Sequence, residues 1–173
     1  MLCHVVSAAL GGMVKIIGID PGLSDTGIGI VTGEGLRVKE YSYGTVSTSK
    51  HELLPGRLAK IYSRLYAILT DEKPHQRIVE EVFSLSKYPK SGIALGKVTG
   101  VILLAGHQCG VPLAEVSLRA AKQILTGNGN ADKMQLEKSV RQKLKLKDPI
   151  RPDHASDALG LALLGLYLYK ERS

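Results

Sequence analysis

Acidic side chains follow two short apolar runs of the sequence, at the points where strands would end. Asp20 comes directly after the β-branched run Val14 to Ile19, and Glu80 and Glu81 close the run "RIVEE". If these runs are parallel neighbours in one sheet, their carboxyl ends lie at the same edge, where ligands bind in α/β folds. Side-chain alternation puts Glu80 and Glu81 on opposite faces, and spacing alone leaves open which of them faces Asp20.

A histidine and an aspartate near the C-terminus could join these acids. His154 and Asp157 stand three residues apart in "RPDHASDALG", so a helix that begins here carries both on one face. Asp153 is the expected N-cap of that helix. In isolation, His154 and Asp157 would be a solvated first turn, in which the acid complements the helix dipole.

Gathered carboxylates repel one another unless protons or cations hold them, so the set predicts a metal site. Oxygen-rich ligands favour Mg²⁺ or Mn²⁺, and two such ions about 4 Å apart can activate water and stabilise the leaving oxygen of a phosphodiester. An equally supported alternative for Asp20 alone is a cap on the turn at Pro21 and Gly22. Further along, Gly27 and Gly29 predict the close approach of a backbone or a ligand.

The chain has 173 residues, of which 44% are hydrophobic and 23% charged, and this favours a single domain. The net charge of +7 predicts a polyanionic partner, with nucleic acid the leading candidate. The basic residues recur in clusters: Arg119 and Lys122, then Lys138, Arg141, Lys143, Lys145 and Lys147. Such a charge run is also typical of a solvated helix face.

Cysteine content and apolar runs indicate the compartment. Only Cys3 and Cys109 occur, without the spacing of a zinc or redox motif, and this favours a reducing cytoplasm. No apolar run reaches the ~20 residues that span a bilayer, so no membrane association is expected. We interpret residues 1–12 as an extension outside the fold, with translation starting at Met13 and one domain covering residues 13–170.

The apolar periodicities predict an α/β fold in the order β-β-β-α-β-α-β, followed by helices. The first, fourth and fifth strands are expected to be parallel, because helices connect them. The expected strands are Val14 to Ile19, Thr26 to Thr32, Leu36 to Val46, Arg77 to Glu81 and Gly110 to Val116. The expected helices run from Glu52 to Pro74, Ser91 to Gln108, Ser117 to Leu125, Ala131 to Leu146 and Asp153 to Lys170.

Four ordered blocks carry a family resemblance. The segments "GIDPGLSDTG", "IVEEVFSLSKYPKSGIALGKVTGV", "RAAKQILTGNGNADKMQ" and "DHASDALGLAL" resemble the RuvC-type Holliday junction resolvases, from Met13 to about Leu168. The resemblance implies an RNase H-like fold with a mixed five-stranded sheet flanked by helices. It also implies a homodimer that cuts four-way junction DNA symmetrically, with Mg²⁺ or Mn²⁺, in recombination and repair. A branch-migration complex is the implied partner.

The resemblance assigns roles to individual residues. Asp20, Glu80 and Asp157 resemble the family's catalytic acids, and His154 stands where many relatives have Asp. These four are the implied metal ligands. Lys122 and Lys133 resemble the active-site lysines, which suit contact with phosphate and with developing negative charge. Without the resemblance, each lysine would be assigned to a solvated helix face.

Further residues are expected to contact DNA or a second subunit. Phe83, the only phenylalanine, resembles the aromatic that wedges against junction bases, although a core position is its simpler interpretation. The full set of expected DNA contacts is Phe83, Lys87, Arg119, Lys122 and Lys133. Gly92, Gly96 and Gly100 form a smooth ridge, which with Ile93 and Val101 is expected to form the dimer contact or, alternatively, to pack on the sheet.

Three other functions compete with junction cleavage. A nucleic-acid-binding module would keep the basic surface but would need no clustered acids. A phosphate-loop ATPase of the actin or sugar-kinase type also uses a strand followed by an Asp-x-Gly loop, but it requires two such halves. The strongest alternative is an RNase H-like nuclease that acts on RNA or on other branched or duplex nucleic acid.

Overall fold

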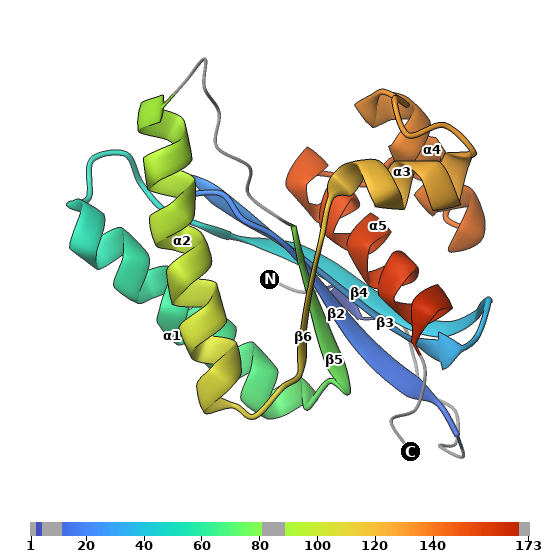
Figure 1. Cartoon of the computed structure of the whole chain (residues 1–173), viewed down its shortest axis with the longest axis horizontal. Helices are drawn as coiled ribbons and strands as arrows, with labels where there is room; N and C mark the ends of the chain where they lie inside the picture. The colour runs from blue at the N-terminus through green and yellow to red at the C-terminus, as the bar shows by residue number, and fades with distance from the viewer. Residues whose placement is uncertain (1–2, 5–11, 81–88, 170–173) are drawn as a thin grey trace.

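A computed structural model describes residues 3–4, 12–80 and 89–169, which form one mixed sheet with helices on both faces (Figure 1). The strands are β1 (Cys3–His4), β2 (Val14–Asp20), β3 (Asp25–Glu34), β4 (Arg37–Ser47), β5 (Gln76–Glu80) and β6 (Leu113–Val116). The helices are α1 (Leu54–Glu72), α2 (Pro89–Gln108), α3 (Leu118–Thr126), α4 (Lys133–Lys143) and α5 (Asp153–Leu168). Among the described residues, none of the helices has both the length and the apolar character that crossing a bilayer requires.

The strand order β1-β4-β3-β2-β5-β6 confirms the expected topology of the central strands. β2, β3 and β4 pair antiparallel as a meander, and β5 lies parallel to β2 and to β6. The paired residues of β2 and β5 include Gly18 with Ile78 and Ile19 with Val79. The next residue on each strand is an acid, Asp20 on β2 and Glu80 on β5.

The sheet has one strand more than the five expected. Cys3 and His4 pair antiparallel with Tyr43 and Ser42 of β4. The middle of β4 would otherwise be an open sheet edge, and edge strands carry unpaired N–H and C=O groups that favour such pairing. This pairing differs from the expectation that all of residues 1–12 lie outside the fold.

Side-chain alternation divides the core into two layers. Ile17, Ile19 and Val79 pack with α1 and α2 on one face of the sheet. Ile16 and Ile78 pack with α5 on the other face. Because residues two apart on a strand share a face, the α5 face also carries the acids that follow these isoleucines by four and two positions.

Helix α5 is buried between the sheet on one side and α3 and α4 on the other (Figure 1). Glycines in the strands make this close approach possible. A Cβ atom on Gly18 would lie 2.1 Å from the carbonyl oxygen of Ala158, and one on Gly29 would lie 2.5 Å from the backbone nitrogen of Leu159. The expected close approach at Gly29 is therefore that of a helix backbone.

Candidate active site

Asp20 ends β2 on the α5 face and is only 5% exposed. Its Oδ2 atom lies 2.5 Å from Nδ1 of His154, at the start of α5. Other groups hold the turn that follows: the Thr26 hydroxyl donates to the carbonyl of Gly22, and the Ser47 hydroxyl donates to Asp25. The side chain of Asp20 is thus directed to the helix.

Glu80 shares this face because Ile78, two residues earlier, packs against α5. It is close enough to hydrogen-bond Asp20, and the charge of Asp157 also acts on it. Spacing alone leaves open whether Glu80 or Glu81 faces Asp20. Because Ile78 lies on the α5 face, Glu80 is the acid that faces Asp20. Glu81 lies outside the described residues.

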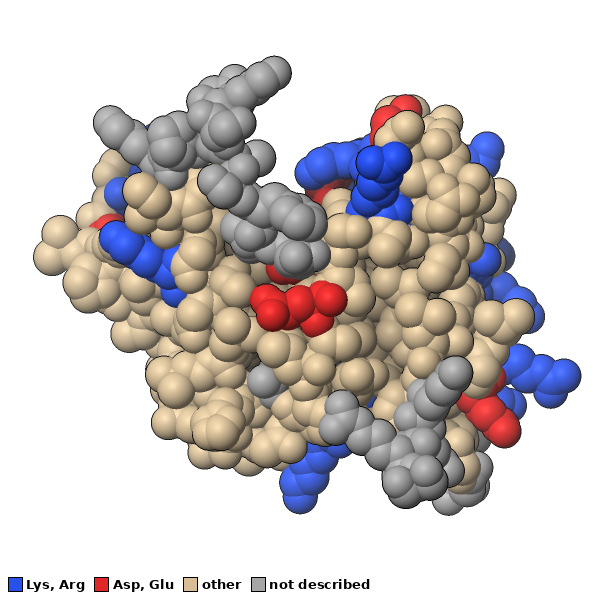
Figure 2. Space-filling model, viewed as in Figure 1, with Lys and Arg blue, Asp and Glu red and all other residues tan. Residues whose placement is uncertain are grey.

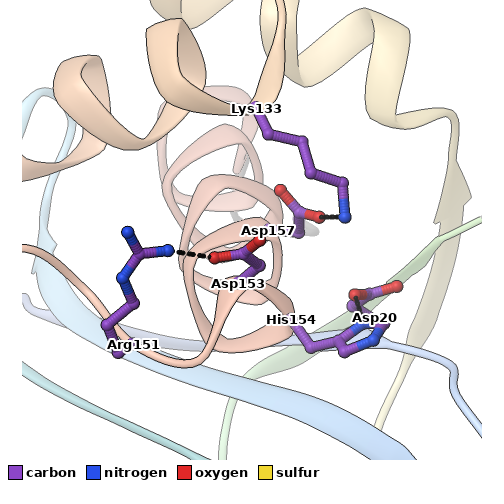
Figure 3. Close-up of polar contacts among 6 residues, drawn as sticks. All are labelled: Asp20, Lys133, Arg151, Asp153, His154 and Asp157. Atoms are coloured by element: carbon purple, nitrogen blue, oxygen red, sulfur yellow. Dashed lines mark hydrogen bonds and ion pairs between the residues drawn. The ribbon is translucent and has the colours of Figure 1, made fainter.

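The first turns of α5 supply His154 and Asp157 (Figure 3). The N-cap of this helix is Pro152, in an extended conformation, so the expected N-cap role of Asp153 is wrong. Asp153 is instead the first helical residue, where a carboxylate complements the helix dipole, and it pairs with Arg151 at 2.5 Å. In Figure 3 this exposed pair lies apart from Asp20 and His154.

Lys133, the first residue of α4, faces the same group of acids (Figure 3). Its Nζ atom lies 3.6 Å from Oδ2 of Asp157, which is 4% exposed. The capping box of Asp132 and Gln135 fixes the helix start, because each side chain accepts from the other residue's backbone N–H. The well-defined start of α4 therefore holds the ammonium group of Lys133 near the acids.

The electrostatics of the site are those of crowded acids. Burial, followed by the hydrogen bond and charge of Asp20, raises the pKa of Glu80 to about 8. Burial and the charge of Asp20 also raise the pKa of Asp157, while Lys133 opposes that shift. The pKa of His154 is raised chiefly by its hydrogen bond to Asp20. The site thus favours bound protons or other cations.

The other residues expected to contact DNA are Lys122, Arg119, Phe83 and Lys87. The positive charge of Lys122 on α3 acts to lower the pKa of Asp157, although less than the charge of Lys133 does. Arg119 lies one turn earlier on α3, against the loop at Gly129. Figure 2 shows Lys and Arg side chains on the side of the molecule that α3 and α4 form. The expected DNA contacts Phe83 and Lys87 lie outside the described residues.

The chemistry of these donors suits a hard divalent cation. Asp157, which is buried, and Glu80, which is partly buried, have raised pKa values, and Asp20 beside them is a third carboxylate. The three provide oxygen ligands, whose mutual repulsion an ion would relieve. Within the described residues, no three such side chains are already arranged around one point. His154 bonds Asp20 directly, and Lys133 lies on Asp157, so these side chains would reorient toward an ion.

Two sets of hydrogen bonds hold the loops beside the site. They could not be predicted from the sequence, because they join residues that are not neighbours in the chain. Thr48 donates through its hydroxyl to the carbonyl of Leu23, and Arg57 donates to the Thr48 hydroxyl at 2.8 Å. This network holds the loop after Asp20. Glu137 on α4 accepts from the backbone N–H of Ile150 at 3.0 Å and so holds the loop before α5.

Comparison with known proteins identifies the family of this chain. Residues 16–164 match the family profile described as "Crossover junction endodeoxyribonuclease RuvC". Curated proteins of that name from Syntrophomonas wolfei and Desulfitobacterium hafniense are 39% and 36% identical to this chain, over 91% and 86% of its length and 91% and 89% of their own. The structure described as "T. thermophilus RuvC in complex with Holliday junction substrate" is 33% identical, with a TM-score of 0.80 over 87% of this chain and 91% of that one. The match over most of the chain, together with the acids at the sheet edge, shows that this protein belongs to the RuvC family of crossover junction endodeoxyribonucleases.

Proposed function

We propose that this protein is a metal-dependent endodeoxyribonuclease that resolves four-way DNA junctions by paired symmetric cuts, in recombination and repair. One observation carries the proposal: Asp20, Glu80, His154 and Asp157, from three separate elements, converge at one edge of the sheet. Membership of the RuvC family supplies the substrate class, because the similar solved protein is described with a Holliday junction substrate.

The proposed ligands are these same four residues, which would hold Mg²⁺ or Mn²⁺, with two ions as the expected number. Such ions supply an activated water and stabilise the leaving oxygen. Glu80 and Asp157 must lose their protons to bind an ion, so their raised pKa values make a proton compete with the metal and make binding of the ion stronger as pH rises. Lys133, whose ammonium group pairs with Asp157, and Lys122, whose charge acts on Asp157, are the proposed donors to a phosphate oxygen.

The exposed face of α2 supports a homodimer. Ile93 and Leu104 are 61% and 50% exposed, and the positions of Gly96 and Gly100 between them are open on the outer side of the helix. Val101 is partly buried against the core, so it contributes less to this face than expected. Two copies joined here would present two active sites to a junction of approximate two-fold symmetry.

Junction DNA is favoured over RNA and over simple duplex by the family match. The phenylalanine wedge, the branch-migration partner and the cytoplasmic location stay predictions, as does the choice between Mg²⁺ and Mn²⁺. The alternative RNase H-like nuclease would use the same acids, so only a comparison of substrates separates the two functions.

Purified protein should be incubated with labelled four-way junction, Y-fork, duplex and RNA–DNA hybrid, with and without each divalent metal. We expect symmetric paired cuts in the junction that require metal. Asp20→Asn should lose cleavage but bind the junction at least as well, because the substitution removes a negative charge near phosphate. Glu80→Gln should behave in the same way, and Glu81→Gln is the matched control that should remain active.

Two results would contradict this proposal. Faster cleavage of the hybrid than of the junction would favour the RNA-directed alternative. Full cleavage by Asp20→Asn at saturating metal would remove Asp20 from the site, whatever the substrate.

A further inference from the structure

Most of the chain's net positive charge lies in one short segment. Residues 133–151 contain seven lysines and arginines but only Glu137 and Asp148 as acids, so their net charge is +5 of the chain's +7. Only the first of these cations, Lys133, belongs to the candidate active site. The other six cations are not explained by the metal site.

This segment runs away from the active site and returns to it. Helix α4 begins with Lys133 beside Asp157 and ends at Lys143, whose ammonium group lies 5.6 Å from the ring centre of Tyr167, near the far end of α5. Ten residues of helix cover about 15 Å. The chain then returns along residues 144–152 to the start of α5.

The returning loop is attached to α4. Arg141 donates through Nη1 to the carbonyl of Lys147 at 3.2 Å and pairs through Nε with Glu137 at 3.3 Å. Glu137 also accepts from the N–H of Ile150. These bonds occupy Arg141 and Glu137 and hold the lysines of the loop beside those of the helix.

All five lysines of this segment are exposed, but Lys133 pairs with Asp157 and Lys143 lies over the ring of Tyr167. Lys138 on α4 and Lys145 and Lys147 on the loop are exposed, and the ion pairs found in the described part of the chain give none of them an acidic partner. We call Lys138, Lys145 and Lys147 the α4 strip. Figure 2 shows Lys and Arg side chains spaced along the edge of the molecule on the side of α4.

We propose that the α4 strip binds the phosphate backbone of a duplex arm of the junction, outside the active site. This inference rests on the proposed function. The 15 Å from Lys133 to Lys143 corresponds to about four or five phosphates at 3.4 Å per nucleotide of one strand. Lysines act as point charges without the planar fork that reads base edges, so the contact orients the arm without selecting a sequence.

The test compares two triple variants in an Asp20→Asn background, in which DNA is bound but not cut. Lys138→Gln/Lys145→Gln/Lys147→Gln removes the α4 strip. Lys39→Gln/Lys50→Gln/Lys60→Gln removes the same charge from exposed lysines elsewhere and is the matched control. Junction affinity is measured by fluorescence anisotropy over a range of KCl concentrations, after thermal unfolding has shown that both variants fold.

We expect the strip variant to bind about tenfold or more weakly near 0.1 M salt, and the slope of log affinity against log salt to become shallower by about two to three, because each lost phosphate contact releases about one counterion fewer. The control variant should keep the wild-type slope. In the chain that keeps Asp20 and so cleaves DNA, the three substitutions of the strip should raise the KM for the junction and leave kcat unchanged, because the strip touches no reacting atom.

Methylphosphonate substitutions then locate the contact. Neutral linkages about two to five nucleotides from the cut, the distance that α4 covers at 3.4 Å per nucleotide, should weaken binding by the parent Asp20→Asn chain but not by the strip variant. Linkages at the cut should weaken binding by both. The inference is overturned if the strip and control variants bind alike, or if the strip variant loses as much affinity for single strands as for the junction. Failure of wild type to cut junctions would instead refute the proposed function, and the binding comparison would still decide on the strip.

Discussion

His154 bonds Asp20 directly, and two roles for its imidazole follow from that contact. As a ligand, it must be neutral and turn toward an ion. As a positioning group, it keeps its hydrogen bond to Asp20, and protonation strengthens that bond. The raised pKa of His154 in the ion-free protein means that a proton competes with metal to a higher pH than at an ordinary histidine.

The substitution His154→Asp separates these roles. Imidazole suits Mn²⁺ better than Mg²⁺, which prefers hard oxygen ligands, so the variant should gain Mg²⁺ activity relative to Mn²⁺ activity, by about tenfold in the ratio. It should also lose the fall in rate toward low pH that a histidine ligand causes. Cleavage rates from pH 5.5 to 9 in each metal provide the measurement. An unchanged metal ratio with a reduced rate would assign His154 to positioning Asp20.

The acids of the site could be found from the sequence because each stands at the end of a recognisable element. Spacing alone left the choice between Glu80 and Glu81 open, and the family resemblance indicated Glu80. The packing of Ile78 against α5 supplies the physical reason, because it places Glu80 on the face of Asp20. The bond between Asp20 and His154 joins residues 134 positions apart, and no local pattern encodes such a contact.

At the scale of elements, the site depends on how closely α5 approaches the sheet. Gly27 on β3 lies opposite Asp20 on β2 and directly under the start of the helix. A Cβ atom on Gly27 would lie 2.0 Å from the carbonyl oxygen of His154, a distance that real contacts do not show. Glycine is needed here because it lets the start of α5, which carries His154 and Asp157, approach the sheet. It is not needed for an unusual backbone conformation.

Replacing Gly27 with alanine should therefore displace the start of α5. We expect a loss of stability of about 3 kcal/mol, the upper range for overpacking, because the clash is with backbone. Cleavage should fall by more than tenfold even at temperatures where circular dichroism shows a folded chain. Gly56→Ala on α1 is the control, since a Cβ atom there meets nothing within 4 Å, and it should leave both quantities nearly unchanged. Normal cleavage by folded Gly27→Ala would contradict this account.

The sequence predicted the central strands and every helix of the described chain because each has a clear apolar period and a turn at its ends. It did not predict β1, since two residues, Cys3 and His4, are too few to show a period. It also misplaced the N-cap of α5: Asp153 has the right side chain for a cap, but the extended Pro152 before it takes that position.

At the scale of the whole molecule, negative and positive charges are separated. The acids crowd at one edge of the sheet, while residues 133–151 carry most of the net positive charge. Polyanion binding thus needs no contact with the acids, and binding and cutting should be separable by mutation. The same crowding makes the stability of the ion-free protein depend on pH.

The folded-state pKa of Glu80, about 8, lies above its ordinary value of 4.5. The folded chain therefore binds this proton more tightly than the unfolded chain, so the stabilisation is fully present below about pH 4.5 and is lost as pH rises through about 8. The raised pKa of Asp157 has the same sign. Between pH 6 and pH 9, metal-free protein should lose on the order of 2 kcal/mol, or about 4–8 °C in Tm.

Thermal unfolding in a chelating buffer, monitored by circular dichroism at pH 6, 7.5 and 9, provides the measurement. Glu80→Gln should have a flatter profile because its side chain does not titrate, and Glu72→Gln, at an acid far from the site that pairs with Lys15, should keep the wild-type slope. Mg²⁺ should restore most of the stability lost at pH 9, since the ion replaces the protons that the acids have released. A wild-type Tm that stays level or rises from pH 6 to 9 in the chelating buffer would show that these acids do not repel one another in the folded protein.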